Sequence, residues 1–346
     1  MKKAVKNLMR FGLIFLLTFV FLYFFFRSVD WKETLSYLTG VNFKFLILLI
    51  VLVPLHLVTR AIRWNYLLQY EKRGVSFYNR FAGNTIGFTV TWIFPGRLGE
   101  LVKPLYLAQK ERMSKGFVIG TIVVERIFDI FTMCFLLGLF LVSKPLYSSY
   151  FHADKDAYSN LYLWGIVGVA FASFMLLVAL SLYFFREKTL TAISFLLKPF
   201  PKKFSQKVLE LMEEFIQGLK FFHSLGNLLM YILFSFVVWL GIIFYYWIFL
   251  FAYNISVPFF FIFPYVFLTM VGASIPTPGM LGGFHYFSKL GLTSFLHIDP
   301  NQAIGMTILV HAIQIVVTCL LGYAILWKEG ISLFQLKKLG EDKNQQ

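Results

Sequence analysis

Three charged residues lie within five positions of a long apolar segment. Glu125, Arg126 and Asp129 fall inside residues 117–142, and a stretch of this length can cross a bilayer, because a spanning helix needs roughly 20 apolar residues. Glu125 follows Phe117 by eight residues, which places it roughly 12 Å along a helix that starts there. A charge near the bilayer centre costs on the order of 3 kcal/mol. We therefore expect a polar site within the membrane.

The spacing inside this cluster suggests how its members act together. Glu125 and Asp129 are four residues apart, and Arg126 and Asp129 are three apart, so each pair shares a helix face. In the functional interpretation, Arg126 binds a substrate phosphate while Glu125 or Asp129 orients it or carries a proton. The alternative is a structural ion pair that locks helix packing. The two interpretations are compatible.

A second cluster follows a Pro-Gly break. Arg97, Glu100 and Lys103 are spaced by three residues, directly after Pro95 and Gly96. Such a break before a helix exposes backbone N–H groups that favour an anion such as phosphate. The guanidinium of Arg97 adds a bidentate phosphate donor, and Glu100 balances the charge. The alternative is a basic cluster that anchors the helix to lipid headgroups.

A third segment, residues 276–285, contains two prolines and three glycines and cannot continue a helix. Its unwound backbone would offer amides and carbonyls to a ligand. His285 is a candidate group for titration near neutral pH, or else a hydrogen-bonded interior histidine. The breaks expected to line the site are Pro95, Gly96 and Gly99 in one segment, and Pro276, Pro278, Gly279, Gly282 and Gly283 in the other.

The composition indicates an all-α, polytopic membrane protein. Hydrophobic residues make up 58% of the 346 residues and charged residues only 14%, against about 25% charged in soluble domains. The net charge of +15 comes from basic residues between apolar segments. This placement is typical of cytoplasmic loops and attracts anionic lipids. We find no nucleic-acid, ATP-binding, metal-ligand or cofactor motif, and so expect no cofactor and no enzymatic activity encoded in this chain.

The apolar pattern predicts about eight membrane segments and one re-entrant segment. Residues 81–109, broken at Pro95 and Gly96, have basic flanks on both sides. Arg60 and Arg63, assigned to the preceding loop, provide part of one flank. The segment should therefore enter the membrane and turn back, with both chain termini in the cytoplasm. The membrane segments are expected at residues 8–26, 43–62, 117–142, 161–185, 228–253, 259–275, 284–296 and 303–327.

The chain divides into a membrane domain and a short tail. Residues 1–330 are expected to form the membrane domain, and residues 331–346 a cytoplasmic tail. Within the domain, residues 186–226 form a cytoplasmic amphipathic segment, because apolar side chains recur there every three or four positions. The two broken segments lie at corresponding places in the two halves. This arrangement favours an inverted repeat and is typical of transporter sites.

Taken together, the three motifs resemble the flippase-like membrane domain of lysylphosphatidylglycerol synthases, over about residues 10–328. The resemblance implies a helical domain with re-entrant helices that moves lipids across the membrane. The family's two-part synthases carry a separate soluble domain for lysyl transfer, which we do not expect here. Two positions depart from the family pattern, since Met280 stands at a frequent glycine and His285 at a frequent acidic residue.

We therefore expect a protein of the cytoplasmic membrane that moves or handles an anionic phospholipid or polyprenyl-phosphate headgroup. Arg97, Lys103 and Arg126 would contact the phosphate, and Glu100, Glu125 and Asp129 would orient these cations and balance their charge. One alternative is a membrane enzyme that uses Glu125 or His285 as a base. Another is a non-catalytic subunit that assists a separate lipid-synthesis enzyme. The expected partners are anionic lipids, with a homo-oligomer or such an enzyme as further candidates.

Overall fold

The structure, a computed structural model, describes residues 2–27, 29–142, 185–219 and 225–332, with scattered positions between 166 and 181. In these parts the chain forms helices and no strand, which confirms the all-α prediction. The helices are α1 Lys2–Phe26, α2 Trp31–Thr39, α3 Phe43–Leu68, α4 Phe77–Ile93, α5 Gly99–Glu111, α6 Lys115–Val142, α8 Arg186–Leu196, α9 Lys202–Leu219, α10 Leu225–Phe251, α11 Ile262–Ser274, α12 Gly283–Leu296 and α13 Pro300–Glu329.

Three of these helices, α3, α10 and α13, are long and apolar enough to cross a membrane. Helix α6 has 28 residues and is as long, but it carries the charged cluster near its middle. The predicted segments at residues 43–62, 117–142, 228–253 and 303–327 correspond to these four helices. The residues between the predicted segments 117–142 and 161–185, most of the segment at 161–185 and most of the tail lie outside the described residues.

Helix α3 extends beyond its predicted end at residue 62. Trp64, Leu67 and Leu68 are fully buried, so the apolar stripe continues past the first arginines and the helix continues with it. Arg60 and Arg63 consequently lie inside α3 and are buried, not in a cytoplasmic loop as their sequence position suggested. The sequence interpretation was wrong here, because it took basic residues as the end of a span.

Residues 77–111 form a helical hairpin, as the re-entrant prediction requires. Helices α4 and α5 pack against one another, and the three-residue turn Pro95–Arg97 joins them. A Cβ added to Gly99 would overlap the carbonyl oxygen of Gly87, so both positions must be glycine for the two backbones to touch. We call this unit hairpin 1.

A second hairpin, α11–α12, repeats these features. A Cβ on Gly283 would lie 2.6 Å from the carbonyl oxygen of Gly272, so a glycine pair also closes hairpin 2. The turns share the pattern Pro-Gly-x-Leu-Gly, residues 95–99 and 278–282. Their backbones match as well. Gly96 and Gly279 have φ 78° and 57° with ψ 21° and 20°, and the following Arg97 and Met280 have φ 56° and 57°.

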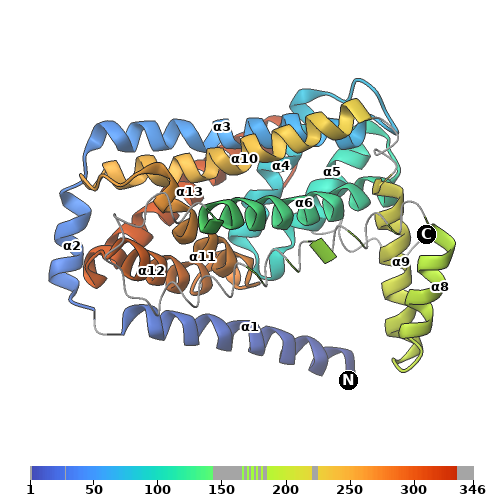
Figure 1. Cartoon of the computed structure of the whole chain (residues 1–346), viewed down its shortest axis with the longest axis horizontal. Helices are drawn as coiled ribbons and strands as arrows, with labels where there is room; N and C mark the ends of the chain where they lie inside the picture. The colour runs from blue at the N-terminus through green and yellow to red at the C-terminus, as the bar shows by residue number, and fades with distance from the viewer. Residues whose placement is uncertain are drawn as a thin grey trace.

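The hairpins belong to two halves with opposite directions. The order α3, hairpin 1, α6 recurs as α10, hairpin 2, α13. Helices α3 and α10 lie side by side in Figure 1. They are antiparallel, because Phe45 stacks on Phe251 near one end of the pair and Tyr66 stacks on Phe234 toward the other. This arrangement matches the predicted inverted repeat. The hairpin tips also meet, because a Nη of Arg97 donates to the carbonyl of Ala273 at 2.5 Å.

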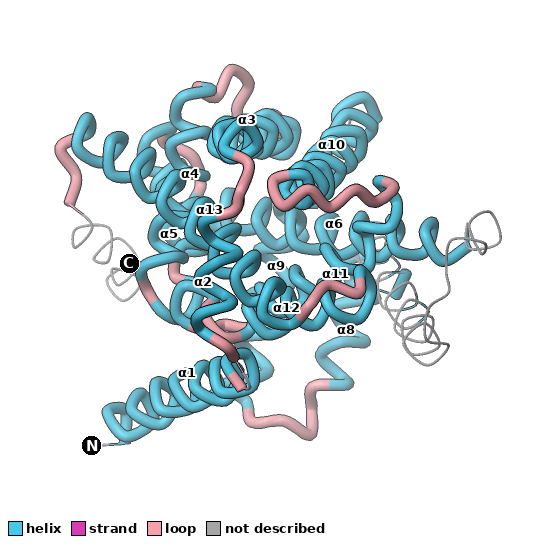
Figure 2. Tube along the Cα trace, turned by 90° about the vertical axis from the view of Figure 1, so that its left-hand side faces the viewer, coloured by secondary structure: helices cyan, strands magenta, loops and turns pink. Residues whose placement is uncertain are grey.

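The remaining helices surround these two halves. Helix α1 packs on α12, and it lies on the opposite side of the bundle from α3 in both views (Figures 1 and 2). Helices α8 and α9 run crosswise at the end of the long helices, and α9 packs on α6, which confirms a helix in the amphipathic segment. The sequence analysis missed α2. Its signal is Asp30, whose carboxylate caps the N–H groups of Lys32 and Glu33.

The glycine contacts give a stability test. Gly99→Ala and Gly272→Ala should each lower the free energy of unfolding by roughly 1–3 kcal/mol or more, because a rigid backbone carbonyl blocks the new methyl group. Thermal unfolding in detergent would show the loss. The control is Gly226→Ala, an exposed helical position with open space around its Cβ, where no loss is expected. Unchanged stability for both hairpin variants would contradict the close packing.

Candidate functional site

A cavity of about 710 Å³ lies between the two halves. Its lining comes from the middle of each long helix, including residues 52–60 of α3, 126–134 of α6, 239–246 of α10, and 314 and 318 of α13. If these helices cross the bilayer, the cavity is near its midplane. Both hairpins also contribute, through residues such as Phe88, Arg97 and Glu100 of hairpin 1 and Met280 and Phe284 of hairpin 2.

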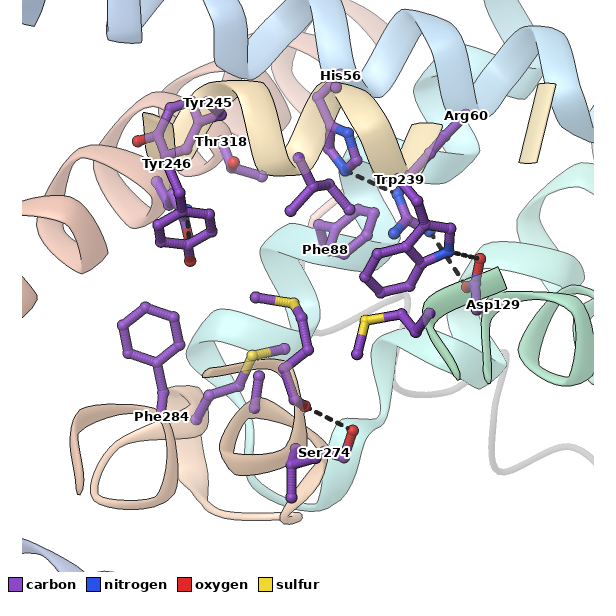
Figure 3. Close-up of a pocket in the computed structure, with 18 of the residues that line it drawn as sticks. His56, Arg60, Phe88, Asp129, Trp239, Tyr245, Tyr246, Ser274, Phe284 and Thr318 are labelled. Atoms are coloured by element: carbon purple, nitrogen blue, oxygen red, sulfur yellow. Dashed lines mark hydrogen bonds and ion pairs between the residues drawn. The ribbon is translucent and has the colours of Figure 1, made fainter. Parts of the chain in front are cut away.

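The two walls of the cavity differ in chemistry (Figure 3). Tyr245, Tyr246, Thr318, His56 and Arg60 lie along one side in the close-up, and Phe284 and the end of α11 lie along the other. Most of the remaining lining is apolar and includes Ile130, Met133, Phe267, Met270 and Val271. An amphipathic cavity of this size lies within the range of small-molecule sites, about 300–1,000 Å³.

A buried ion network stands at one end of the cavity. Lys103 Nζ lies 2.7 Å from a carboxylate oxygen of Glu125, and Arg63 Nη1 lies 2.6 Å from one of Asp129. Arg60 Nη1 lies 3.3 Å from a carboxylate oxygen of Glu125 and 3.7 Å from one of Asp129. The guanidinium of Arg126 also contacts both, at 3.1 Å from Glu125 and 3.4 Å from Asp129. The network therefore joins α3, hairpin 1 and α6.

Neutral side chains complete the network. The indole N–H of Trp239 donates to Asp129 at 3.1 Å, which brings α10 into the cluster. The ammonium of Lys103 lies 4.4 Å from the centre of the Trp64 ring, a cation–π geometry. Trp64 is itself fixed, because its Nε1 donates to Thr121 Oγ1 at 2.9 Å. These contacts hold the charged groups in defined positions.

The charges around this end of the cavity do not balance. Among the described residues of the network and the adjoining tip of hairpin 1, five cations face three carboxylates, which leaves an excess of two positive charges. The sequence analysis counted three of each and expected near neutrality. It omitted Arg60 and Arg63, whose inclusion changes the balance. The groups are Arg60, Arg63, Arg97, Lys103 and Arg126 against Glu100, Glu125 and Asp129.

Two of the three predicted phosphate ligands line the cavity, and the third, Lys103, lies behind its wall. Arg97 and Arg126 line it, together with Glu100 and Asp129. Arg97 and Glu100 form a pair at 3.1 Å. Lys103 and Glu125 are not among the lining residues and lie behind, as does Arg63.

The predicted helix breaks shape the hairpin tips and contribute little to the cavity surface. Within residues 95–99 only Arg97 lines the cavity, and within residues 276–283 only Met280 does. The break at Gly279 packs directly on the carbonyl oxygen of Trp92, which a Cβ would approach to 2.9 Å. The breaks thus let the two tips approach each other. The predicted breaks at the tip of hairpin 1 are Pro95, Gly96 and Gly99, and those at the tip of hairpin 2 are Pro276, Pro278, Gly279, Gly282 and Gly283.

His285 lies outside the cavity lining. It is buried on α12, with its ring 5.1 Å from that of Phe25 and 4.6 Å from that of His311. His311 in turn stacks on Phe284, at 4.4 Å between ring centres. His285 is therefore an interior histidine and not a ligand of the cavity, but its Nδ1 has no hydrogen-bond partner among the described residues, unlike the hydrogen-bonded histidine that the alternative expected.

Several residues of the cavity lining and of the ion network behind it were not predicted from the sequence. Arg60 and Arg63 carried a signal, since they are spaced by three within an apolar stripe, like the charges of α6. The neutral lining gave none, because an aromatic or amide side chain in an apolar helix is compatible with many environments. This group comprises His56, Trp239, Tyr245, Tyr246, Gln314 and Thr318.

Long apolar helices, two helical hairpins and a charged central cavity define a multi-pass integral membrane protein. Comparison with known proteins gives the family. Residues 10–322 match the lysylphosphatidylglycerol synthase TM region, so the chain belongs to this family, as its motifs indicated.

Two archaeal proteins of related sequence are described as UPF0104 membrane proteins. The one from Methanocaldococcus jannaschii is 23% identical over 325 residues, which cover 90% of this chain and 92% of the relative. The one from Pyrococcus horikoshii is 25% identical over 229 residues, covering 60% and 64%.

The ion network predicts a strong effect of removing one carboxylate. Glu125→Gln should lower the free energy of unfolding by about 3–5 kcal/mol, because it leaves buried cations without a partner. Adding Lys103→Met should recover part of the loss, since it removes the cation that pairs with Glu125. Unfolding in detergent would measure both. The control is Glu210→Gln, at an exposed position of α9. A purely additive double variant would contradict the proposed pairing.

Proposed function

We propose that this protein binds the phosphate of an anionic membrane lipid in the central cavity and moves that headgroup across the bilayer. The acyl chains would stay in the surrounding lipid. The observation that carries the proposal is the excess of two positive charges beside a cavity halfway along the long helices. Membership of the lysylphosphatidylglycerol synthase TM family supports a role with lipids.

The energetics of the cluster favour an anionic ligand. Each unpaired cation at membrane depth costs on the order of 3 kcal/mol, and a bound phosphate would offset this cost. Arg60, Arg97 and Arg126 all line the cavity, and guanidinium groups match phosphate in bidentate geometry. The Nε atoms of Arg97 and Arg126 have no hydrogen-bond partner among the described residues.

The hairpin tips provide a means of coupling binding to movement. Arg97 lines the cavity and also donates to the carbonyl of Ala273 in the other half. A lipid phosphate that competes for Arg97 would weaken this contact between the tips. Paired broken helices in inverted halves are the arrangement from which many transporters alternate access to a central site.

Transport is proposed in preference to catalysis because the candidate bases are poorly placed. Glu125 lies behind the cavity wall and is held by cations from three elements. His285 is packed among aromatic rings outside the cavity lining. We also propose, from the distribution of basic residues, that the protein resides in the cytoplasmic membrane with both termini in the cytoplasm. Association with a second copy or with a lipid-synthesis enzyme stays a prediction.

A flipping assay tests the proposal. Proteoliposomes would carry phosphatidylglycerol with a fluorescent label on an acyl chain, and a membrane-impermeant reductant would report the leaflet of the label over time. Arg126→Gln should slow movement roughly 10- to 100-fold, because it removes a charge-assisted bond worth about 1.5–3 kcal/mol. Glu100→Gln should alter the rate by freeing Arg97 from its partner.

The matched control for Arg126→Gln is Arg73→Gln, an exposed arginine in the loop after α3. It should move lipid at the wild-type rate. Chemically changed lipid after incubation would instead indicate an enzyme. Equal rates in the wild type, Arg126→Gln and protein-free liposomes would overturn the proposed function.

A further inference from the structure

The cavity has a second polar end that the phosphate site leaves unused. Tyr245 and Tyr246 of α10 and Gln314 and Thr318 of α13 line it. In Figure 3 the two tyrosines and Thr318 lie away from Asp129 and the guanidinium of Arg60. The amide of Gln314 lies 3.3 Å from the hydroxyl of Tyr246. Tyr246 is fully buried and Thr318 is 3% exposed. We call these four residues the neutral polar end.

His56 connects this end to the ion network. Its Nε2 accepts a hydrogen bond from Arg60 Nε at 2.8 Å, so a neutral imidazole carries its proton on Nδ1. That Nδ1 has no hydrogen-bond partner among the described residues, and His56 lines the cavity. In Figure 3 the ring lies between Arg60 and Thr318. One wall of the cavity therefore carries polar side chains from the charged end, through His56, to the neutral end.

The charges along this wall select the chemistry of what it binds. Of the residues that line the cavity, only Glu100 and Asp129 are carboxylates. Both are engaged at the charged end, Glu100 by Arg97 and Asp129 by Arg60, Arg63 and Trp239. An ammonium group at the neutral polar end would find no counter-charge and would approach an excess of positive charge. Hydroxyl groups can both donate to and accept from amide, phenol and imidazole groups.

We infer that the neutral polar end binds an uncharged, hydroxyl-bearing group attached to the lipid phosphate, such as a glycerol or a hexose, and excludes amine-bearing headgroups. The inference rests on the proposed function and specifies its substrate class. Phosphate binds at Arg60, Arg97 and Arg126, and the hydroxylated group extends past His56 toward Gln314 and Tyr246. Trp239 and Tyr245 supply aromatic surfaces on this path.

The test compares headgroups in the same flipping assay, with the label on an acyl chain, or on the prenyl chain of a polyprenyl lipid, so that each headgroup is unaltered. Four lipids serve as probes in phosphatidylcholine liposomes. Phosphatidylglycerol and a polyprenyl-phosphate hexose carry hydroxyl groups, phosphatidic acid carries the phosphate alone, and phosphatidylethanolamine carries an amine. Wild-type protein should move at least one hydroxylated lipid about tenfold faster than phosphatidic acid, the change expected from one or two hydrogen bonds. Phosphatidylethanolamine should be slowest.

Variants of the neutral polar end should then reduce the preference. Gln314→Leu and Tyr246→Phe should each lower the ratio of the hydroxylated-lipid rate to the phosphatidic acid rate toward one. The matched control is Tyr323→Phe, on the same helix as Gln314 but half exposed at its surface, and it should keep the wild-type ratio. Thermal unfolding checks that each variant is folded, and Thr318→Val replaces any variant that is not.

The outcomes separate the two proposals. Equal rates for all lipids, still reduced by Arg126→Gln, would overturn the headgroup preference and leave the phosphate site standing. A faster rate for phosphatidylethanolamine would overturn it as well. If no lipid moves faster than in protein-free liposomes, the proposed function fails and the inference fails with it. The faster of the two hydroxylated lipids shows whether the neutral polar end prefers glycerol or hexose.

Discussion

The ion pairs among α3, hairpin 1 and α6 hold together the elements on which the cavity depends. Glu125 and Asp129 bring charge into the middle of a 28-residue helix, where no apolar partner could stabilise them. Their cations come from two other elements, Arg60 and Arg63 on α3 and Lys103 on hairpin 1. Satisfying the two carboxylates therefore fixes three elements relative to one another. Because more cations converge than two carboxylates can neutralise, the same contacts that assemble the first half also leave it positively charged.

Glycine contacts allow a turn of backbone to lie inside a membrane domain. A re-entrant hairpin exposes amides and carbonyls unless protein covers them. The pairs Gly87–Gly99 and Gly272–Gly283 let each hairpin close without a gap, and the two tips then cover one another through Arg97 and Gly279. The second half carries no ion network comparable to that of the first among the described residues. The halves therefore share a backbone plan but differ in side-chain chemistry, and the cavity between them has one charged end and one neutral end.

The sequence was sufficient for features that follow from local composition. Apolar length located the long helices, Pro-Gly pairs located the hairpin tips, and charges in an apolar stretch located the network. It was insufficient where a pattern has two physical meanings. Arg60 and Arg63 resemble the basic end of a span until the buried Trp64 and Leu67 are counted with them. Gln314 and Tyr246 resemble ordinary interior residues, because only the tertiary arrangement of α10 and α13 brings them to one cavity.

The distribution of charge between fixed and moving parts bears on how a membrane potential would act on the proposed transport. Moving one charge through 100 mV is worth about 2.3 kcal/mol. If a carrier moved its uncompensated cations, the membrane potential would therefore act on the charges of the protein as well as on the charge of the lipid. Here Arg60 and Arg63 belong to a long helix and are tied to α6. The tip of hairpin 1, whose contact with Ala273 the proposed mechanism would break, carries Arg97 and Glu100, which pair with each other. A mechanism in which the tips move and the long helices stay would displace little protein charge, so the potential would act mainly on the phosphate of the lipid.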